Sequence, residues 1–292
     1  MVAALKRFDV SGCKTLDSVL NRIGATDDYT EAKAPGGFEG YKGIIDPNGR
    51  KIAVVSSSYD LLQPREALNF VLPVVEEFGI TFTKAAYLQG GCQLVIQGKL
   101  ADLEVDRSDL RKGDIVALGI NFFTSFDGSK RSSFGLQMER CWCDNGCTSW
   151  EQLAGFQVKH TKNQRDRIET QLDELDGLDE VVDRLQTTMC ELAHLQIDGD
   201  TADKIIKRVV NKDSTRATNQ REAISREFNN KDRGTYGETG WDLFNAFTAY
   251  ATHEVTYRQT ANTSREENRL SSVLFGDAYS RKVVNTIMAV AA

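Results

Sequence analysis

Apolar and polar positions follow different patterns in the two halves of the chain. Up to about residue 150, short runs rich in β-branched and aromatic residues are separated by turns with glycine or proline, which is typical of strands. Beyond that point, apolar residues recur every three or four positions, which is typical of amphipathic helices. The pattern predicts an α+β fold, with an N-terminal, mainly antiparallel sheet followed by a long helix and a helical C-terminal region.

The sheet region is predicted to have the order ββαβββ or one close to it. The turn residues DPNG at 46–49 predict a hairpin, and a helix is expected to follow, with Pro64 in its first turn, a bend at Pro73 and a stop at Gly79. The connections are short, which favours antiparallel pairing. Strands are expected over the apolar runs at 41–45, 51–55, 80–88, 92–100, 115–126 and 131–143.

The second half is predicted to begin with one long amphipathic helix from Arg165 to Leu195, acidic in its early part and preceded by the basic stretch 159–167. Shorter helices are expected at 16–23, 202–212, 215–228, 239–255 and 277–291. The predicted organisation is an N-terminal segment with a short helix, an α+β core that includes the long helix, and a helical C-terminal region. Their bounds are 1–36, 37–195 and 196–292.

Four aromatic residues of the helix expected at 239–255 predict self-association, because one thin helical layer buries few large rings. These residues are Trp241, Phe244, Phe247 and Tyr250.

Composition and charge place the chain among globular proteins, with 40% hydrophobic and 27% charged residues. The first residues include no long apolar stretch, so we expect neither a secretory signal nor a spanning helix, and a cytoplasmic location without membrane contact. In that compartment the six cysteines are expected to be reduced thiols. A net charge of −6 disfavours indiscriminate coating of nucleic acid, although it permits a local basic groove.

Three cysteines, Cys141, Cys143 and Cys147, form a C-x-C-x3-C cluster with His160 further along. Structural zinc normally requires paired C-x2–4-C knuckles, so we expect no metal here, although a metal site or a catalytic thiol paired with His160 stays open. Glycine-rich phosphate loops of the known types are absent, and no cofactor is expected.

A second candidate site combines aromatic and basic residues. Phe122 and Phe126 precede the turn that holds Lys130 and Arg131, and Trp142 follows in the cysteine cluster. Aromatic rings beside cationic side chains can stack on bases and bind phosphates. The alternative is a hydrophobic strand with a solvated turn.

Several segments resemble a family of phage- and plasmid-borne proteins known as domain of unknown function 932. They are IAVVSSSYDLLQPREALNF, GGCQLVIQGKL, FFTSFDGSKRSSFGLQMERCWCDNGC, VKHTKN, GETGWDLFNAFTAYATH and SSVLFGDAYSRK, and the resemblance covers about residues 37 to 282.

Members of that family typically show DG in a hairpin, an Arg-x-x-Cys-x-Asn string and a later histidine. Here these fall on Asp127-Gly128, Arg140, Cys143, Asn145 and His160, with an additional cysteine on each side of Cys143.

The resemblance implies a role on DNA in a bacterial host. The strand order is also similar, at the level of fold only, to phage single-strand annealing proteins of the RecT, Redβ and Erf classes. We therefore expect a non-enzymatic, ATP-independent protein that binds and anneals single-stranded DNA in phage or plasmid recombination or replication. It is expected to form a ring or filament of identical chains, with a phage exonuclease or host single-strand-binding protein as a further partner.

The expected phosphate-binding residues are Lys130, Arg131, Arg140, Lys159, His160, Lys162, Arg165 and Arg167. The expected base-stacking residues are Phe122, Phe126 and Trp142. Two other readings stay open. One is an interaction protein that blocks a host defence factor through its acidic helix, and the other is a metal-dependent enzyme built on the cysteine cluster.

Overall fold

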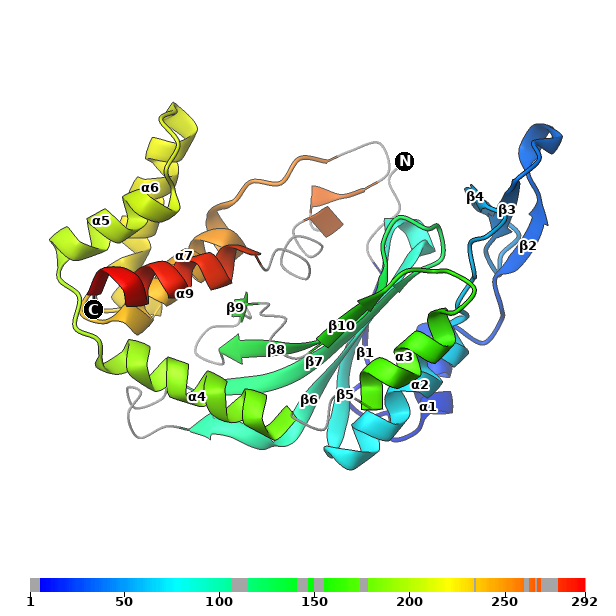
Figure 1. Ribbon diagram of the computed structural model, residues 1–292, viewed down its shortest axis with the longest axis horizontal. Coiled ribbons are helices and arrows are strands. Elements are labelled where there is room, and N and C mark those ends of the chain that lie inside the picture. Colours follow the sequence, from blue (N-terminus) through cyan, green and yellow to red (C-terminus); the bar gives the residue numbers. More distant parts are fainter. Residues whose placement is uncertain are drawn as a thin grey trace.

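A computed structural model gives the arrangement of the chain (Figure 1). The structure describes residues 6–106, 115–140, 147–149, 155–173, 178–233, 235–259, 263–265, 267–268 and 278–291.

The predicted α+β class is confirmed: two antiparallel sheets are followed by helices. The strands are β1 (Lys6–Asp9), β2 (Thr30–Lys33), β3 (Tyr41–Ile45), β4 (Lys51–Ser56), β5 (Ile80–Leu88), β6 (Gln93–Asp106), β7 (Ile115–Ser125), β8 (Ser132–Arg140), β9 (Cys147–Ser149) and β10 (Gly155–Val158). The α-helices are α1 (Leu16–Ile23), α2 (Pro64–Glu77), α3 (Gln164–Asp173), α4 (Leu178–His194), α5 (Gly199–Val209), α6 (Thr215–Phe228), α7 (Gly240–Ala249) and α9 (Ala278–Ala291).

The large sheet has the strand order β1-β5-β6-β7-β8-β10, and β9 pairs with β8 beside β10. Every pairing is antiparallel, as the short connections predict. The sequence pattern missed the strands β1, β2, β9 and β10, which have three or four residues each. Such short strands carry too few alternations to be recognised by period.

One face of the large sheet is covered by α1, α2 and α3 (Figure 1). Leu118, Ile120 and Phe122 of β7 point into the core beneath these helices, and each is at most 2% exposed. Burial of these side chains stabilises the fold by about 1.5–3 kcal/mol each. Because the helices cover this face, its aromatic residues are not available to a ligand.

Local signals fix the helix ends. Thr15 caps α1 in a capping box with Ser18, and Gly24 ends it with a positive φ of 68°. Ser214 caps α6 by accepting from the N–H of Ala217. For α1 and α6 the predicted bounds are the observed ones, and α2 continues through Pro73 to Glu77.

The single helix expected from Arg165 to Leu195 is wrong. The chain forms two helices there, and they lie in different places: α3 packs on β10 and α2, whereas α4 packs on α7 (Figure 1). Gly177 lies in the sequence between them. A glycine within a helix lowers its stability by about 1 kcal/mol relative to alanine, so Gly177 was the sequence signal for a break.

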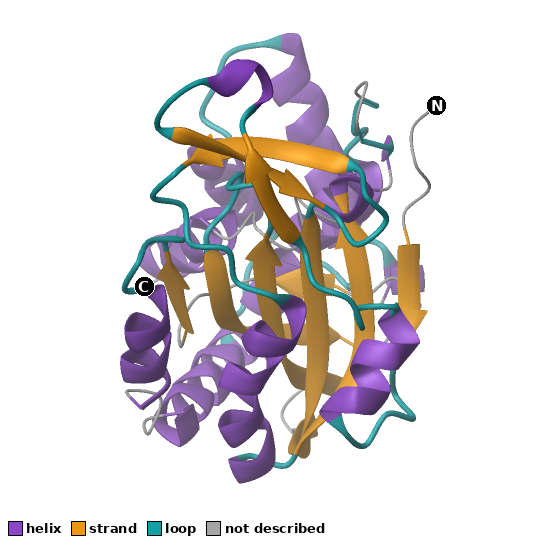
Figure 2. Ribbon diagram, turned by 90° about the vertical axis from the view of Figure 1, so that its right-hand side faces the viewer, coloured by secondary structure: helices purple, strands orange, loops and turns teal. Residues whose placement is uncertain are grey.

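The small sheet, β2-β3-β4, lies across one end of the large sheet (Figure 2). Its predicted hairpin is confirmed: Asp46 Oδ1 accepts hydrogen bonds from the N–H groups of Asn48 (3.0 Å) and Arg50 (2.8 Å), and Gly49 has a φ of 80°. Gln63 ties the sheet to the body, since its amide exchanges two hydrogen bonds with the main chain of Tyr29 at 2.8 and 3.0 Å.

The C-terminal helices form their own layer around α7, every residue of which is buried. Trp241, Phe244 and Phe247 are 5%, 4% and 1% exposed, so the chain covers them by itself. Burial of these three rings within the chain removes the argument for self-association that rested on them, and self-association itself stays a prediction. In the described part of the chain, no helix combines the length and the apolar character needed to cross a bilayer.

We predict that Phe247→Ala lowers the free energy of unfolding by about 3–5 kcal/mol, because it removes a fully buried ring and leaves a cavity. Phe38→Ala is the matched control: this ring is 71% exposed, and the expected change is within about 0.5 kcal/mol. Urea unfolding measures both. Equal effects of the two substitutions would contradict the buried position of α7.

Candidate nucleic-acid interface

Two basic segments that are distant in sequence meet at one end of the large sheet. Strands β8 and β10 pair so that Ser132 lies opposite Val158. Arg131 comes just before the first of these residues and Lys159 just after the second. Because the two strands are antiparallel neighbours, both side chains leave the same end of the sheet. The pairing of the strands therefore joins the turn at 127–131 to the segment 159–167.

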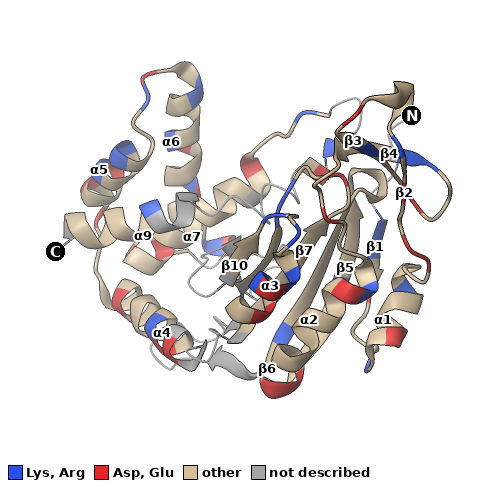
Figure 3. Cartoon of the chain, turned by 45° about the vertical axis from the view of Figure 1, so that its right-hand side comes forward, with Lys and Arg blue, Asp and Glu red and all other residues tan. Residues whose placement is uncertain are grey.

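The exposed cationic residues of these two segments are here called the basic rim; they are Lys130, Arg131, Lys159, Lys162 and Arg167. Figure 3 shows lysine and arginine colouring gathered around the loop before α3. Two carboxylates lie in the same segments. Asp127 is occupied in its own turn, where Oδ1 accepts from the N–H (3.0 Å) and the hydroxyl (2.6 Å) of Ser129. Asp166 is exposed on α3.

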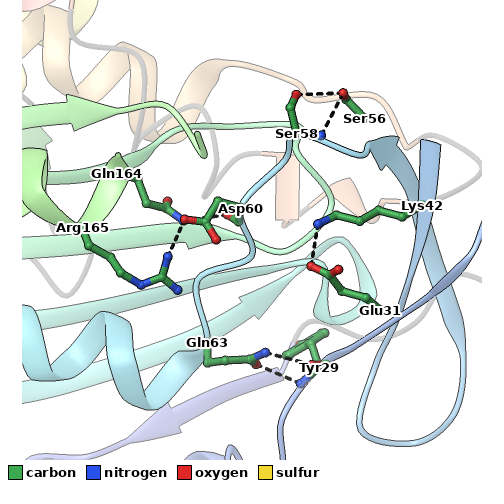
Figure 4. Close-up of polar contacts among 9 residues, drawn as sticks. All are labelled: Tyr29, Glu31, Lys42, Ser56, Ser58, Asp60, Gln63, Gln164 and Arg165. Carbon is green, nitrogen blue, oxygen red and sulfur yellow. Dashed lines mark hydrogen bonds and ion pairs between the residues drawn. The ribbon is translucent and has the colours of Figure 1, made fainter. Parts of the chain in front are cut away.

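Arg165 was expected to bind phosphate, and the structure gives it another role. Its guanidinium donates to Asp60 (Figure 4). It also donates to both oxygens of Glu66, with 3.0 Å between Nη2 and Oε2. The hydrogen bonds to Glu66 and the two neighbouring carboxylates raise its pKa. Since a fork of this kind already satisfies most of its donors, the expected phosphate contact of Arg165 is wrong.

His160 was also expected on the DNA surface, but it is only 7% exposed. Its ring lies 5.0 Å from that of Tyr59, and Nε2 is 3.4 Å from Ser132 Oγ. Burial lowers its pKa from 6.5 to about 4, against the opposing effect of Asp60 and Asp127. A neutral, buried ring cannot hold a phosphate. Nor does it form a reactive pair with Ser132, because that hydroxyl is fully buried and lies 3.0 Å from Thr124 Oγ1.

The stacking role expected of Phe122 and Phe126 is wrong as well. They are 1% and 0% exposed. Phe126 stacks on Tyr29, with ring centroids 4.0 Å apart, and Phe122 faces Phe134 across the β7–β8 pair. The same apolar pattern describes a buried strand and a stacking surface, and here it belongs to a buried strand.

The cysteine cluster lies largely outside the described residues, which exclude Cys141, Trp142 and Cys143. Arg140 is the last residue of β8 and pairs with Cys147 of β9. Among the residues that the structure does describe, no three His, Cys, Asp or Glu side chains come together as metal ligands.

Sequence reasoning missed the exposed aromatic residues of the small sheet. Phe38 and Tyr41 are 71% and 57% exposed. The signal was the stretch GGFEGYKG at 36–43, in which glycines separate aromatic residues next to a predicted hairpin. A core strand would more often show β-branched residues at those positions.

We predict that His160 makes stability depend on pH. Its folded pKa of about 4 lies below the usual 6.5, so the unfolded chain takes up the proton first. The contribution of His160 to the free energy of unfolding is complete above about pH 6.5 and is lost as the pH falls toward 4. The free energy of unfolding should therefore fall by about 2 kcal/mol between pH 7 and pH 4.5 because of this residue. Urea unfolding of His160→Phe should show a pH dependence smaller by that amount. His194→Gln, at an exposed site, is the control. Parallel curves for wild type and His160→Phe would contradict the prediction.

We predict that Arg165→Ala lowers the free energy of unfolding by about 1–2 kcal/mol, because it leaves two half-buried carboxylates without their cation. Arg165→Lys should recover only part of the loss, since an ammonium cannot replace the fork. Lys162→Ala, at an exposed position three residues earlier, should change stability by less than about 0.5 kcal/mol. Chemical denaturation distinguishes the three, and an Arg165→Ala variant as stable as Lys162→Ala would exclude this role.

Comparisons with known proteins identify the family of the chain. No curated protein and no solved structure matches the chain. A family model described as "Domain of unknown function (DUF932)" matches residues 51–274. This range runs from β4 to the segment before α9 and includes the basic rim, so the match covers the large sheet except β1 together with most of the helical layer. The chain therefore belongs to the DUF932 family.

Proposed function

We propose that this chain is a non-enzymatic protein that binds single-stranded DNA through the basic rim. One observation carries the proposal: in a chain with a net charge of −6, the pairing of β8 with β10 brings two segments that hold five exposed cationic residues to the same end of the large sheet. Phosphate contacts by lysine and arginine supply most of the affinity in binding that does not depend on sequence. The rim therefore suits a nucleic-acid backbone.

The rim differs in its balance of charges from the hollow between α5 and α6, which has a volume of about 1040 Å³. That hollow is lined by three basic and three acidic side chains: Lys207, Arg221, Arg226, Asp203, Glu222 and Glu227. Opposite charges in equal number give little net attraction for a polyanion. The rim is the better candidate for binding DNA.

Annealing is the activity that fits such a surface in phage or plasmid recombination. A protein that holds phosphates leaves the bases of a strand accessible to a complementary strand, and base pairing then supplies the driving force without ATP. The contribution of the protein is to concentrate the strands and to screen their mutual repulsion. This role requires exposed cations and no catalytic group.

We predict that Lys159→Ala/Lys162→Ala weakens binding to oligo(dT) and flattens its salt dependence. Each lost phosphate contact on a single strand should reduce the slope of log K against log salt by about 0.7, so the double variant should lose about 1.4. Fluorescence anisotropy over a series of KCl concentrations measures the slope.

The control is Lys204→Ala/Lys207→Ala on α5, which makes the same change in charge on the helical side of the molecule (Figure 1). If both double variants keep the affinity and slope of the wild type, with native circular dichroism, the rim does not bind DNA. If both lose affinity equally, the effect belongs to net charge and the rim has no special part in it.

A further inference from the structure

The small sheet has one buried face and one exposed face. Ile44 and Val55 lie on the inner face and belong to the core, at 0% and 8% exposure. Tyr41 and Val54 lie on the outer face, at 57% and 54% exposure. Gly43 pairs with Val54 and Tyr41 pairs with Ser56, so the two exposed side chains are diagonal neighbours. An aromatic and an aliphatic side chain are thus presented side by side to solvent.

Val54 is one of the residues that line a hollow of about 240 Å³. Its floor is the row Ala32–Gly43–Val54, one residue from each strand. The three atoms nearest to a Cβ at Gly43 would be main-chain oxygens at 3.6–3.9 Å, which is ordinary contact, so this position has room for a side chain. The volume is below the roughly 300–1,000 Å³ of sites for drug-sized ligands. It suits one flat ring.

The charge around the hollow is positive. Lys33 and Lys51 are among the residues that line it, and none of its lining residues is acidic. Glu31, which precedes Ala32 on β2, forms an ion pair with Lys42, with 2.6 Å between Oε1 and Nζ (Figure 4). A flat ring that belongs to a polyanion is therefore favoured over a neutral apolar ligand.

The loop before β3 carries a further exposed ring. Phe38 is 71% exposed and precedes Tyr41 by three residues. A Cβ at Gly36 would lie 3.0 Å from the ring of Phe38, and Gly36 has a φ of +78°, so only glycine leaves the ring in its place. The backbone of this loop thus permits an aromatic ring to stand in solvent.

The small sheet adjoins the basic rim. A Cβ at Gly128 would lie 3.3 Å from Val55 Cγ1 and 3.4 Å from the ring of Tyr59, so the turn at 127–131 packs against the inner face. The main chain continues the contact, since the N–H of Asp60 donates to the carbonyl of His160 at 3.2 Å. The rim therefore lies on the inner side of the small sheet, and a strand held by the rim reaches the outer face around the edge of that sheet.

We propose that the outer face of the small sheet is a stacking platform for unpaired bases, with Phe38 and Tyr41 as its rings and the hollow over Gly43 as a seat for one base. The inference rests on the proposed function, because it places the bases of the strand whose phosphates the rim holds. Aromatic side chains stack on any base, whereas lysines at the border hold the backbone. Bases of a duplex are already stacked on each other and would not occupy the platform.

The test compares oligo(dT) with an abasic oligonucleotide of equal length, which keeps the phosphates and lacks the bases. Phe38→Ala/Tyr41→Ala should lose about tenfold in affinity for oligo(dT) per ring removed. It should keep both its affinity for the abasic strand and its salt slope. Both rings are exposed, so the variant should fold. Gly43→Val, which fills the hollow from an unobstructed position, should weaken oligo(dT) binding in the same selective way.

Tyr236→Ala, at a ring 37% exposed in the segment before α7, is the matched control and should bind both strands as the wild type does. Unchanged oligo(dT) binding by both small-sheet variants would overturn the platform while leaving the rim in place. A wild type that binds neither strand would overturn the proposed function and the platform with it. A third outcome is that the variants bind DNA as the wild type does but differ in the mass of the protein assembly measured by sedimentation. The outer face would then be a contact between copies of the chain, and this result would also overturn the platform.

Discussion

The position of the basic rim depends on a polar connection between two segments that lie 99 to 105 residues apart in sequence. Gln164 donates to the carbonyl of Asp60 at 2.7 Å, and Arg165 joins the side chains of Asp60 and Glu66. The first turn of α3 is thereby fixed to the start of α2. The rim residues Lys159 and Lys162 lie just before Gln164 in the sequence. Their position therefore depends on the contacts that Gln164 and Arg165 make with Asp60 and Glu66.

Two residues that the sequence analysis singled out, Asp127 and His160, have structural roles here. Asp127 shapes its turn, and His160 fills a buried position between Tyr59 and Ser132. Residues of such types usually suggest catalysis, yet both are satisfied or enclosed within the fold. In the described residues, Asp127 and His160 therefore act within the fold.

The sequence predicted elements whose signals are local and missed relationships whose partners are distant. The bounds of α1 and α6 follow from capping residues and period, and the β3–β4 hairpin follows from its turn. Arg165 could not be assigned, because Asp60 and Glu66 are brought to it only by the packing of α3 on α2. Phe122 and Phe126 were misassigned because hydrophobicity along one strand does not reveal which face a helix will cover.

The hydrogen bond from the N–H of Gln89 to the buried carboxylate of Glu267 spans 178 residues. It connects the turn between β5 and β6 to Glu267, so this contact forms only after the chain has been synthesised through residue 267. Contacts so distant in sequence make folding slow and largely post-translational. A chain cut short after α7 has every strand of the large sheet but lacks the carboxylate that binds the turn between β5 and β6, so this turn should open more readily.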